Sequence, residues 1–250
     1  MTFRFVAALA GIATSVIGAV LSFIPATGSP EFYSYLEQTH FLTGAVFGVR
    51  SPAAQSAKQI ATFYTVNNTV TMVISVGTVL IFILLTVFGA GLWTTLRDAE
   101  RERGEAWAIV GLLGATATSA TYTVAAAVTM ALVRVANATT TGQDAVVVAL
   151  FNVQDLIFEL GVVFIVLFLV GFSLAGQRTR AMPAWLAWIG YVSAVLAAAT
   201  GLIGAVAPEA IPPYDFYVGT FGTLLWVFIG SIRLIRGSRH VVSASAPAYR

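Results

Sequence analysis

Six long blocks of mostly apolar residues recur along this chain of 250 residues. They lie at about 3–24, 66–93, 106–135, 145–175, 184–207 and 214–235. Because about 20 apolar residues in a helix cross the ~30 Å hydrocarbon core of a bilayer, they predict an all-α fold, a polytopic six-helix transmembrane bundle. Only 10% of the residues are charged, against roughly 25% in soluble domains, so no sizeable soluble domain fits beside this bundle.

The segments between the blocks predict a simple organisation. We expect a single membrane domain at 1–240, because no repeat or interdomain linker appears, and a polar tail at 241–250. The long segment at 25–64 is rich in Phe and Tyr and predicts an outer cap loop folded back onto the bundle. Its last part, AAQSAKQIATFY, is expected to extend the second spanning helix outwards, and Tyr64 is interpreted as part of the aromatic belt.

The positions of Lys and Arg predict the orientation of the bundle. Ten of the 13 fall on one side if the two chain ends share that side, namely Arg4, Arg97, Arg101, Arg103, Arg178, Arg180, Arg233, Arg236, Arg239 and Arg250. The other side holds Arg50, Lys58 and Arg134. Because cytoplasmic loops carry the excess of basic residues, this bias predicts that both termini are cytoplasmic (N-in, C-in). A net charge of +2 gives no indication of nucleic-acid binding.

Several classes of chemistry are excluded or find no support. The chain has no cysteine, which excludes thiol catalysis, thiolate metal sites and iron–sulfur clusters. No nucleotide-binding, zinc-protease or nucleophile-elbow motif appears. His40 could join Glu37, Asp155 and Glu159 around a metal, but no ligand spacing supports this. We therefore expect no cofactor and no metal.

Three polar residues interrupt the fourth apolar block. Asn152, Asp155 and Glu159 are spaced i, i+3, i+7, which places them on one narrow stripe of a helix. Counted from the inner end of the block at 1.5 Å per residue, Glu159 lies roughly 20 Å and Asp155 roughly 27 Å up, in the outer half of the membrane. Because a carboxylate in hydrocarbon is costly, this stripe is the candidate functional site.

Two further polar stripes are predicted at the same depth. One lies on the second block and comprises Asn67, Thr71, Ser75 and Thr78, and the other lies on the third block and comprises Thr118, Ser119, Tyr122 and Thr129. We expect both to face the bundle interior against the acidic stripe, which would make a pocket open to the outside. In the alternative interpretation, the hydroxyls are helix-packing groups, Asn152 makes an interhelical hydrogen bond and Asp155 forms a salt bridge with Arg134, Lys58 or His40.

The pocket predicts binding of a small lipophilic molecule. Glu159 would donate or accept a proton, and Asp155 would adjust its proton affinity. The ligand-side residues would be Asn152, Tyr122, Ser75 and Asn67, with His40 as a proton shuttle at the mouth. Such a site suits a cofactor-free isomerase or cyclase. The alternatives are a non-enzymatic accessory or structural subunit that binds a partner membrane protein, and a proton-coupled transporter.

A sequence motif at the start of the fifth block resembles a known family. The block begins AMPAWLAWIGYVSAVLAAATGL, and its Pro-x-Trp-Leu-x-Trp-x-Gly pattern is similar to one in an uncharacterised family of six-helix bacterial, mainly actinobacterial, membrane proteins. That family is a domain of unknown function. The resemblance implies a multi-pass protein of the bacterial inner (plasma) membrane, and it reads Trp185, Trp188 and Gly190 as anchoring and packing residues. It carries over no catalytic residue.

Overall fold

The computed structural model describes residues 2–21, 57–138, 142–206 and 215–244, and in this part of the chain the secondary structure is helical. The seven helices are α1 (Phe3–Leu21), α4 (Ala57–Val66), α5 (Asn68–Arg101), α6 (Trp107–Ala136), α7 (Gln143–Arg178), α8 (Ala184–Val206) and α9 (Asp215–Ala244). The prediction of an all-α fold is confirmed. Five of the helices, α1, α5, α6, α7 and α8, are long and apolar enough to cross a membrane.

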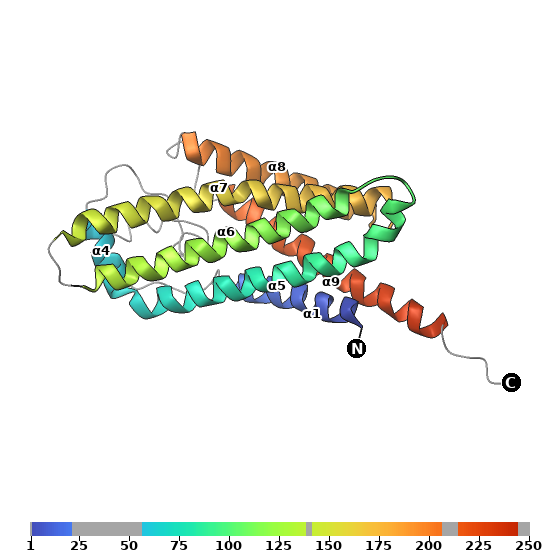
Figure 1. The fold of residues 1–250 in the computed structure, drawn as a ribbon, viewed down its shortest axis with the longest axis horizontal. Coiled ribbons are helices and arrows are strands. Elements are labelled where there is room, and N and C mark those ends of the chain that lie inside the picture. Colours follow the sequence, from blue (N-terminus) through green and yellow to red (C-terminus); the bar gives the residue numbers. More distant parts are fainter. Residues whose placement is uncertain (1, 22–56, 139–141, 207–214, 245–250) are drawn as a thin grey trace.

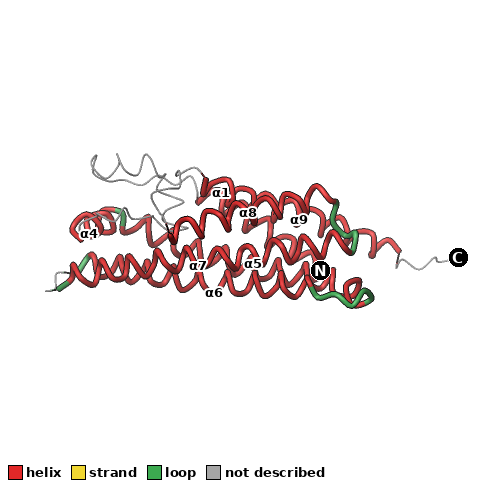
Figure 2. Tube along the Cα trace, turned by 90° about the horizontal axis from the view of Figure 1, so that it is seen from above, coloured by secondary structure: helices red, strands yellow, loops and turns green. Residues whose placement is uncertain are grey.

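The six long helices form a closed ring around a common core. Each contacts its neighbours in the order α1, α5, α6, α7, α8, α9, and α9 returns to α1. Figure 1 shows them running side by side, with the beginning of α1 and the end of α9 toward the same end of the bundle. At the other end, α6 and α7 reach further than α1 (Figures 1 and 2).

The closest packing in the ring is between α6 and α7. A Cβ added at Gly114 would lie 2.3 Å from the backbone nitrogen of Phe168, and one added at Gly171 would lie 2.3 Å from that of Gly111. Small residues let two helix backbones approach closely, which is how helices associate where lipid is as apolar as their side chains. These glycines therefore set the spacing of the α6–α7 pair.

Aromatic side chains fill the centre of the ring toward its arginine-rich end, the end that carries Arg4, Arg101, Arg178 and Arg233. Trp226 of α9 is fully buried, and its ring lies 6.4 Å from Phe88 of α5 and 5.4 Å from Phe168 of α7, both edge-on. Phe172 continues the cluster along α7 at 5.7 Å from Phe168. Because these rings come from three helices, they join the two sides of the ring into one core.

The turn from α5 to α6 is built around a buried carboxylate. Glu100 is buried, and its two carboxylate oxygens accept hydrogen bonds from the backbone N–H of Ala108, at 3.1 and 2.9 Å. It thereby supplies the acceptor that Ala106, at the N-cap of α6, lacks. The helix α5 thus continues two turns beyond the predicted end at 93, because its last polar turn caps the next helix.

The short helix α4 corrects one sequence expectation. Residues 57–66 do not extend α5 outwards, because the chain turns at Asn67. Instead, α4 packs on α6 and α7, and Figure 1 shows it crossing their ends. Ile60, Phe63 and Tyr64 are the buried residues of α4, and they pack into a second apolar cluster at this end of the bundle. The rest of the predicted cap, 25–56, lies outside the described residues.

Candidate functional site

The polar residues of α7 between Asn152 and Glu159 point in three directions. Gln154 lies on the buried face with Phe151 and Phe158 and is 1% exposed. Asp155 and Glu159 are half-buried on the flank of that face, whereas Asn152 is exposed. The predicted stripe exists on the helix, but it lies beside the bundle interior rather than in it. The polar side chain of α7 that enters the interior is therefore Gln154, which the sequence analysis missed.

Gln154 connects α7 to the short helix α4. Its Oε1 accepts a hydrogen bond from the hydroxyl of Tyr64 at 3.4 Å, and the Tyr64 ring lies 6.5 Å from Phe151. Tyr64 is 2% exposed, so its interpretation as part of the interfacial aromatic belt is wrong. It is instead an anchor between α4 and α7.

The hydroxyl of Tyr64 lies in the field of the acidic stripe. Burial raises the pKa of Tyr64 well above its ordinary value of 10.0. The hydrogen bond to Gln154 lowers this pKa in part, and the carboxylate of Asp155 raises it further. Tyr64 is consequently a neutral donor at physiological pH, and Asp155 is close enough to interact with it.

The polar stripes of α5 and α6 face the interior, as predicted, but their polar groups mostly bind helix carbonyls. Ser75 donates to the carbonyl of Thr71 at 2.8 Å, and Asn67 donates to that of Phe63 at 3.1 Å. These bonds use the hydroxyl proton of Ser75 and one amide proton of Asn67, and they leave the side-chain oxygens as acceptors. Within the described chain, the buried hydroxyl oxygens of Thr71, Thr78 and Thr118 have no hydrogen-bond partner.

Tyr122 of α6 is likewise committed to packing. Its ring stacks on Phe82 at 4.5 Å and lies 5.4 Å from Phe158, and its hydroxyl donates to the carbonyl of Phe158 at 3.4 Å. The side chain is 1% exposed. Tyr122 therefore links α5, α6 and α7.

The flank of α7 with the two carboxylates borders α8. A Cβ added at Gly201 of α8 would lie 3.0 Å from Val162 and 3.4 Å from the carbonyl oxygen of Glu159. The helices α7 and α8 thus approach closely about one turn after Glu159 along α7. Asp155 lies one further turn toward the start of α7, so the carboxylates occupy the region where α8 approaches its end at Val206.

The candidate counter-ions are placed as follows. Arg134 is exposed near the end of α6 and forms no ion pair with Asp155. Lys58 is exposed on α4. His40 lies outside the described residues, and so does Glu37. Among the residues that are described, no three His, Cys, Asp or Glu side chains group closely enough to hold a metal ion.

The fold and its apolar helices define the chain as a multi-pass membrane protein. Residues 34–235 match the model of a family described as "Domain of unknown function (DUF4386)". The match covers most of the chain, which therefore belongs to the DUF4386 family. This match confirms the predicted resemblance to a family whose function is unknown. Comparison with the curated proteins and with the solved structures gives no match.

Proposed function

We propose that this DUF4386 protein spans a bacterial inner membrane six times, with both ends in the cytoplasm, and binds a small lipophilic molecule at the acidic flank of α7. The sixth span would be α9, which covers the last apolar block and is 30 residues long. The excess of arginine at the end that carries the start of α1 and the end of α9 supports this orientation. In this orientation Asp155 and Glu159 lie in the outer half of the membrane.

The observation that carries the proposal is the position of Glu159. It is half-buried, in the spanning part of α7, one turn from a second half-buried carboxyl group, Asp155. Keeping such groups in hydrocarbon costs free energy, and neutral residues would pack against α8 at lower cost. Two adjacent carboxyl groups in this place are explained by a ligand that uses them.

The chemistry of the flank suits proton exchange with a largely apolar molecule. Glu159 would take a proton from one carbon of the ligand and return it to another, which is an isomerisation that needs no cofactor. Asp155 would adjust the proton affinity of Glu159. Asn152 would lie at the exposed margin, and the contacts of Tyr122, Ser75 and Asn67 favour a packing role for these three residues.

The test is to identify small molecules that co-purify with the protein. Wild type and Glu159→Gln would be purified in the same detergent, and the bound species would be extracted and identified by mass spectrometry. The matched control is Glu102→Gln, the same change at an exposed glutamate after α5. A species present in wild type and the control and absent from Glu159→Gln supports the proposal. Identical extracts from all three proteins contradict it.

A second candidate function has one observation in its favour. The face of α7 next to the carboxylates is apolar and exposed, with Leu156 at 55% and Leu160 at 63%. With Asn152 exposed on the same helix, this surface fits a helix of a partner membrane protein, as in an accessory subunit. Replacing Leu156 with a photo-crosslinking residue separates the two functions. One discrete protein adduct in membranes supports the accessory subunit, and lipid adducts alone contradict it.

A further inference from the structure

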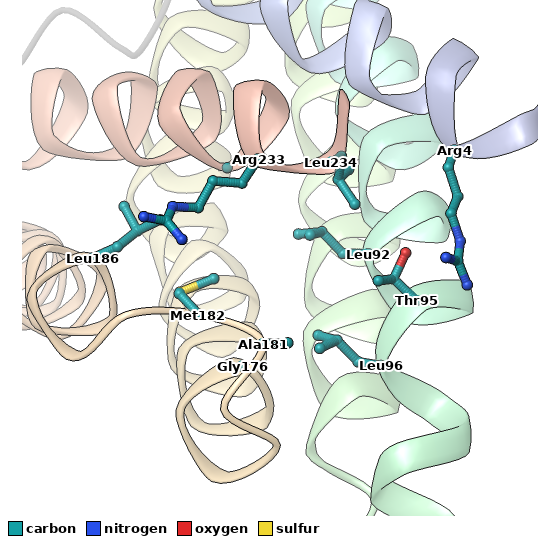
Figure 3. A pocket seen from close by; sticks show the side chains of 11 residues that line it. Arg4, Leu92, Thr95, Leu96, Gly176, Ala181, Met182, Leu186, Arg233 and Leu234 are labelled. Atoms are coloured by element: carbon teal, nitrogen blue, oxygen red, sulfur yellow. The ribbon is translucent and has the colours of Figure 1, made fainter. Parts of the chain in front are cut away.

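A pocket of about 230 Å³ lies at the arginine-rich end of the bundle, far from the acidic flank of α7. Residues of α1, α5, α7, α8 and α9 and of the turn between α7 and α8 line it. Figure 3 shows the guanidinium groups of Arg4 and Arg233 on opposite sides of this pocket, with leucine side chains between them. The pocket thus lies between helices from both sides of the ring, at this end of the bundle.

The charges in this pocket are of one sign. Arg4 and Arg233 are its charged lining residues, and no acidic residue lines it. Within the part of the chain that the structure describes, neither arginine is in an ion pair; the pairs formed are Arg97–Asp98 and Arg178–Glu105. The pocket is therefore positively charged, and an anion beside either guanidinium group would be held by charge-assisted hydrogen bonds.

The walls of the pocket are apolar, which decides what kind of anion fits. Leu92, Met182, Leu186 and Leu234 are buried and line it. A hydrated inorganic anion would lose water against these side chains without compensation. An anion attached to an apolar chain would instead place its charge on the arginines and its first methylene groups on the leucines and Met182.

The size and depth of the pocket point to a lipid of the surrounding bilayer. A volume of 230 Å³ is below the roughly 300–1,000 Å³ of pockets that enclose a drug-sized ligand, so it suits a headgroup. The guanidinium of Arg233 lies 5.9 Å from the ring of Trp185, which is half exposed at the start of α8. Exposed Trp side chains mark the membrane–water interface, where phosphate groups lie.

We propose that this pocket binds an anionic phospholipid from the leaflet at the arginine-rich end, with its phosphate at the guanidinium group of Arg233 beside Trp185 and with the charge of Arg4 on the other side of the pocket adding to the attraction. The glycerol and the first part of the acyl chains lie against Leu92, Leu186 and Met182. Basic pockets between membrane helices are suited to anionic headgroups in this way. The site is independent of Glu159 and of the molecule bound at the outer flank of α7.

The test measures phospholipid retention by native mass spectrometry. The protein is loaded with phosphatidylglycerol in phosphatidylcholine nanodiscs and transferred to detergent, and the bound phosphatidylglycerol is counted. Wild type is expected to keep one molecule. The double variant Arg4→Gln/Arg233→Gln keeps the side-chain stems and removes the charges, and we expect its retention to fall at least about tenfold. Retention equal to wild type would overturn the proposal.

A matched control and a second variant separate the pocket from the general basic surface. Arg101→Gln/Arg103→Gln removes two exposed arginines at the same end that do not line the pocket, and it is expected to retain the lipid like wild type. An equal loss in this control assigns the lipid to diffuse charge attraction and overturns the proposal. Ala181→Phe fills the pocket and keeps both arginines, so it is expected to lose the lipid, and normal retention would place the lipid elsewhere.

A final arm separates a phospholipid from a free anion. Delipidated wild type is titrated with inorganic phosphate in a calorimeter and then with short-chain phosphatidylglycerol. We expect heat only from the lipid, and a reduced heat in Arg4→Gln/Arg233→Gln. Saturable binding of inorganic phosphate that prevents lipid binding would show a free-anion site and contradict the lipid.

Discussion

The hydroxyl of Tyr64 donates a hydrogen bond to Oε1 of Gln154 at 3.4 Å, between two residues that are 90 positions apart. Both side chains are buried, so this contact fixes α4 across α7 without help from water. It also places a neutral donor beside the acidic stripe, since the Asp155 carboxylate acts on the same hydroxyl. The end of the bundle that carries α4 is therefore organised by a pair of polar residues inside an apolar cluster.

Tyr64→Phe is expected to destabilise the protein by about 1 kcal/mol or more, because the Gln154 amide loses a partner while it stays buried. The matched control is Tyr191→Phe. Tyr191 donates to Gln177 at 2.8 Å, but at an exposed place, so its loss should change stability by less than about 0.5 kcal/mol. Unfolding followed by circular dichroism in detergent measures both. An equal effect of the two substitutions would show that burial of the Tyr64 pair contributes nothing.

The raised pKa of Tyr64 predicts how stability depends on alkaline pH. The unfolded chain releases the Tyr64 proton near pH 10, whereas the folded chain keeps it. Above pH 10 the unfolded state binds fewer protons, so stability falls as pH rises. Tyrosinate absorbance before unfolding should be the same in wild type and Tyr64→Phe. A smaller absorbance change in Tyr64→Phe would mean that Tyr64 ionises while the protein is folded.

Hydropathy predicted six spanning helices, and five of them are long and apolar enough in the structure to cross a membrane, because a long uncharged segment has few other structures available in a bilayer. The turn at Asn67 was not predicted, since AAQSAKQIATFY continues a helical pattern into α5. The turn is caused by tertiary contacts. Phe63 and Tyr64 are buried under α6 and α7, and this contact is possible only if the chain bends before α5 begins. No local breaker residue announces that bend.

The candidate site was predicted only in part, for a related reason. The spacing of Asn152, Asp155 and Glu159 defines one stripe, but a stripe has no direction until the neighbours of α7 are known. Because α6 and α8 pack closely on α7, the face of α7 that points into the bundle carries Gln154, and Asn152 is exposed. One sequence signal does indicate that Gln154 is buried. It lies three residues after Phe151 and four before Phe158, which is the spacing of one helix face.

Gly114→Ala is expected to destabilise the protein by about 1–3 kcal/mol, because its new methyl group meets the backbone of Phe168 and forces α6 away from α7. Gly77→Ala is the matched control within a spanning helix. Its methyl group meets the flexible end of Leu21, so repacking and better helix propensity should keep its effect within about 1 kcal/mol. Thermal unfolding in detergent compares them. Equal melting temperatures would contradict the close α6–α7 packing.

The absence of cysteine allows a clean test of the proposed orientation. Arg103→Cys, between α5 and α6, should react with a membrane-impermeant maleimide only after the cells are permeabilised. Ala138→Cys, just after α6, should react on intact cells whose outer barrier is open. Labelling of the cysteine at 103 in such intact cells would reverse the proposed topology and place the acidic flank in the inner half of the membrane.

The central claim is that Glu159 binds a small lipophilic molecule, and ligand-induced stabilisation tests it most directly. The species that co-purifies with wild type is added back to stripped wild type, Glu159→Gln and Glu102→Gln, and the unfolding temperature is measured. At a concentration of 100 times the dissociation constant, bound ligand stabilises the folded state by about 2.7 kcal/mol. The account predicts this increase in wild type and Glu102→Gln and none in Glu159→Gln. An equal increase in all three proteins would contradict it.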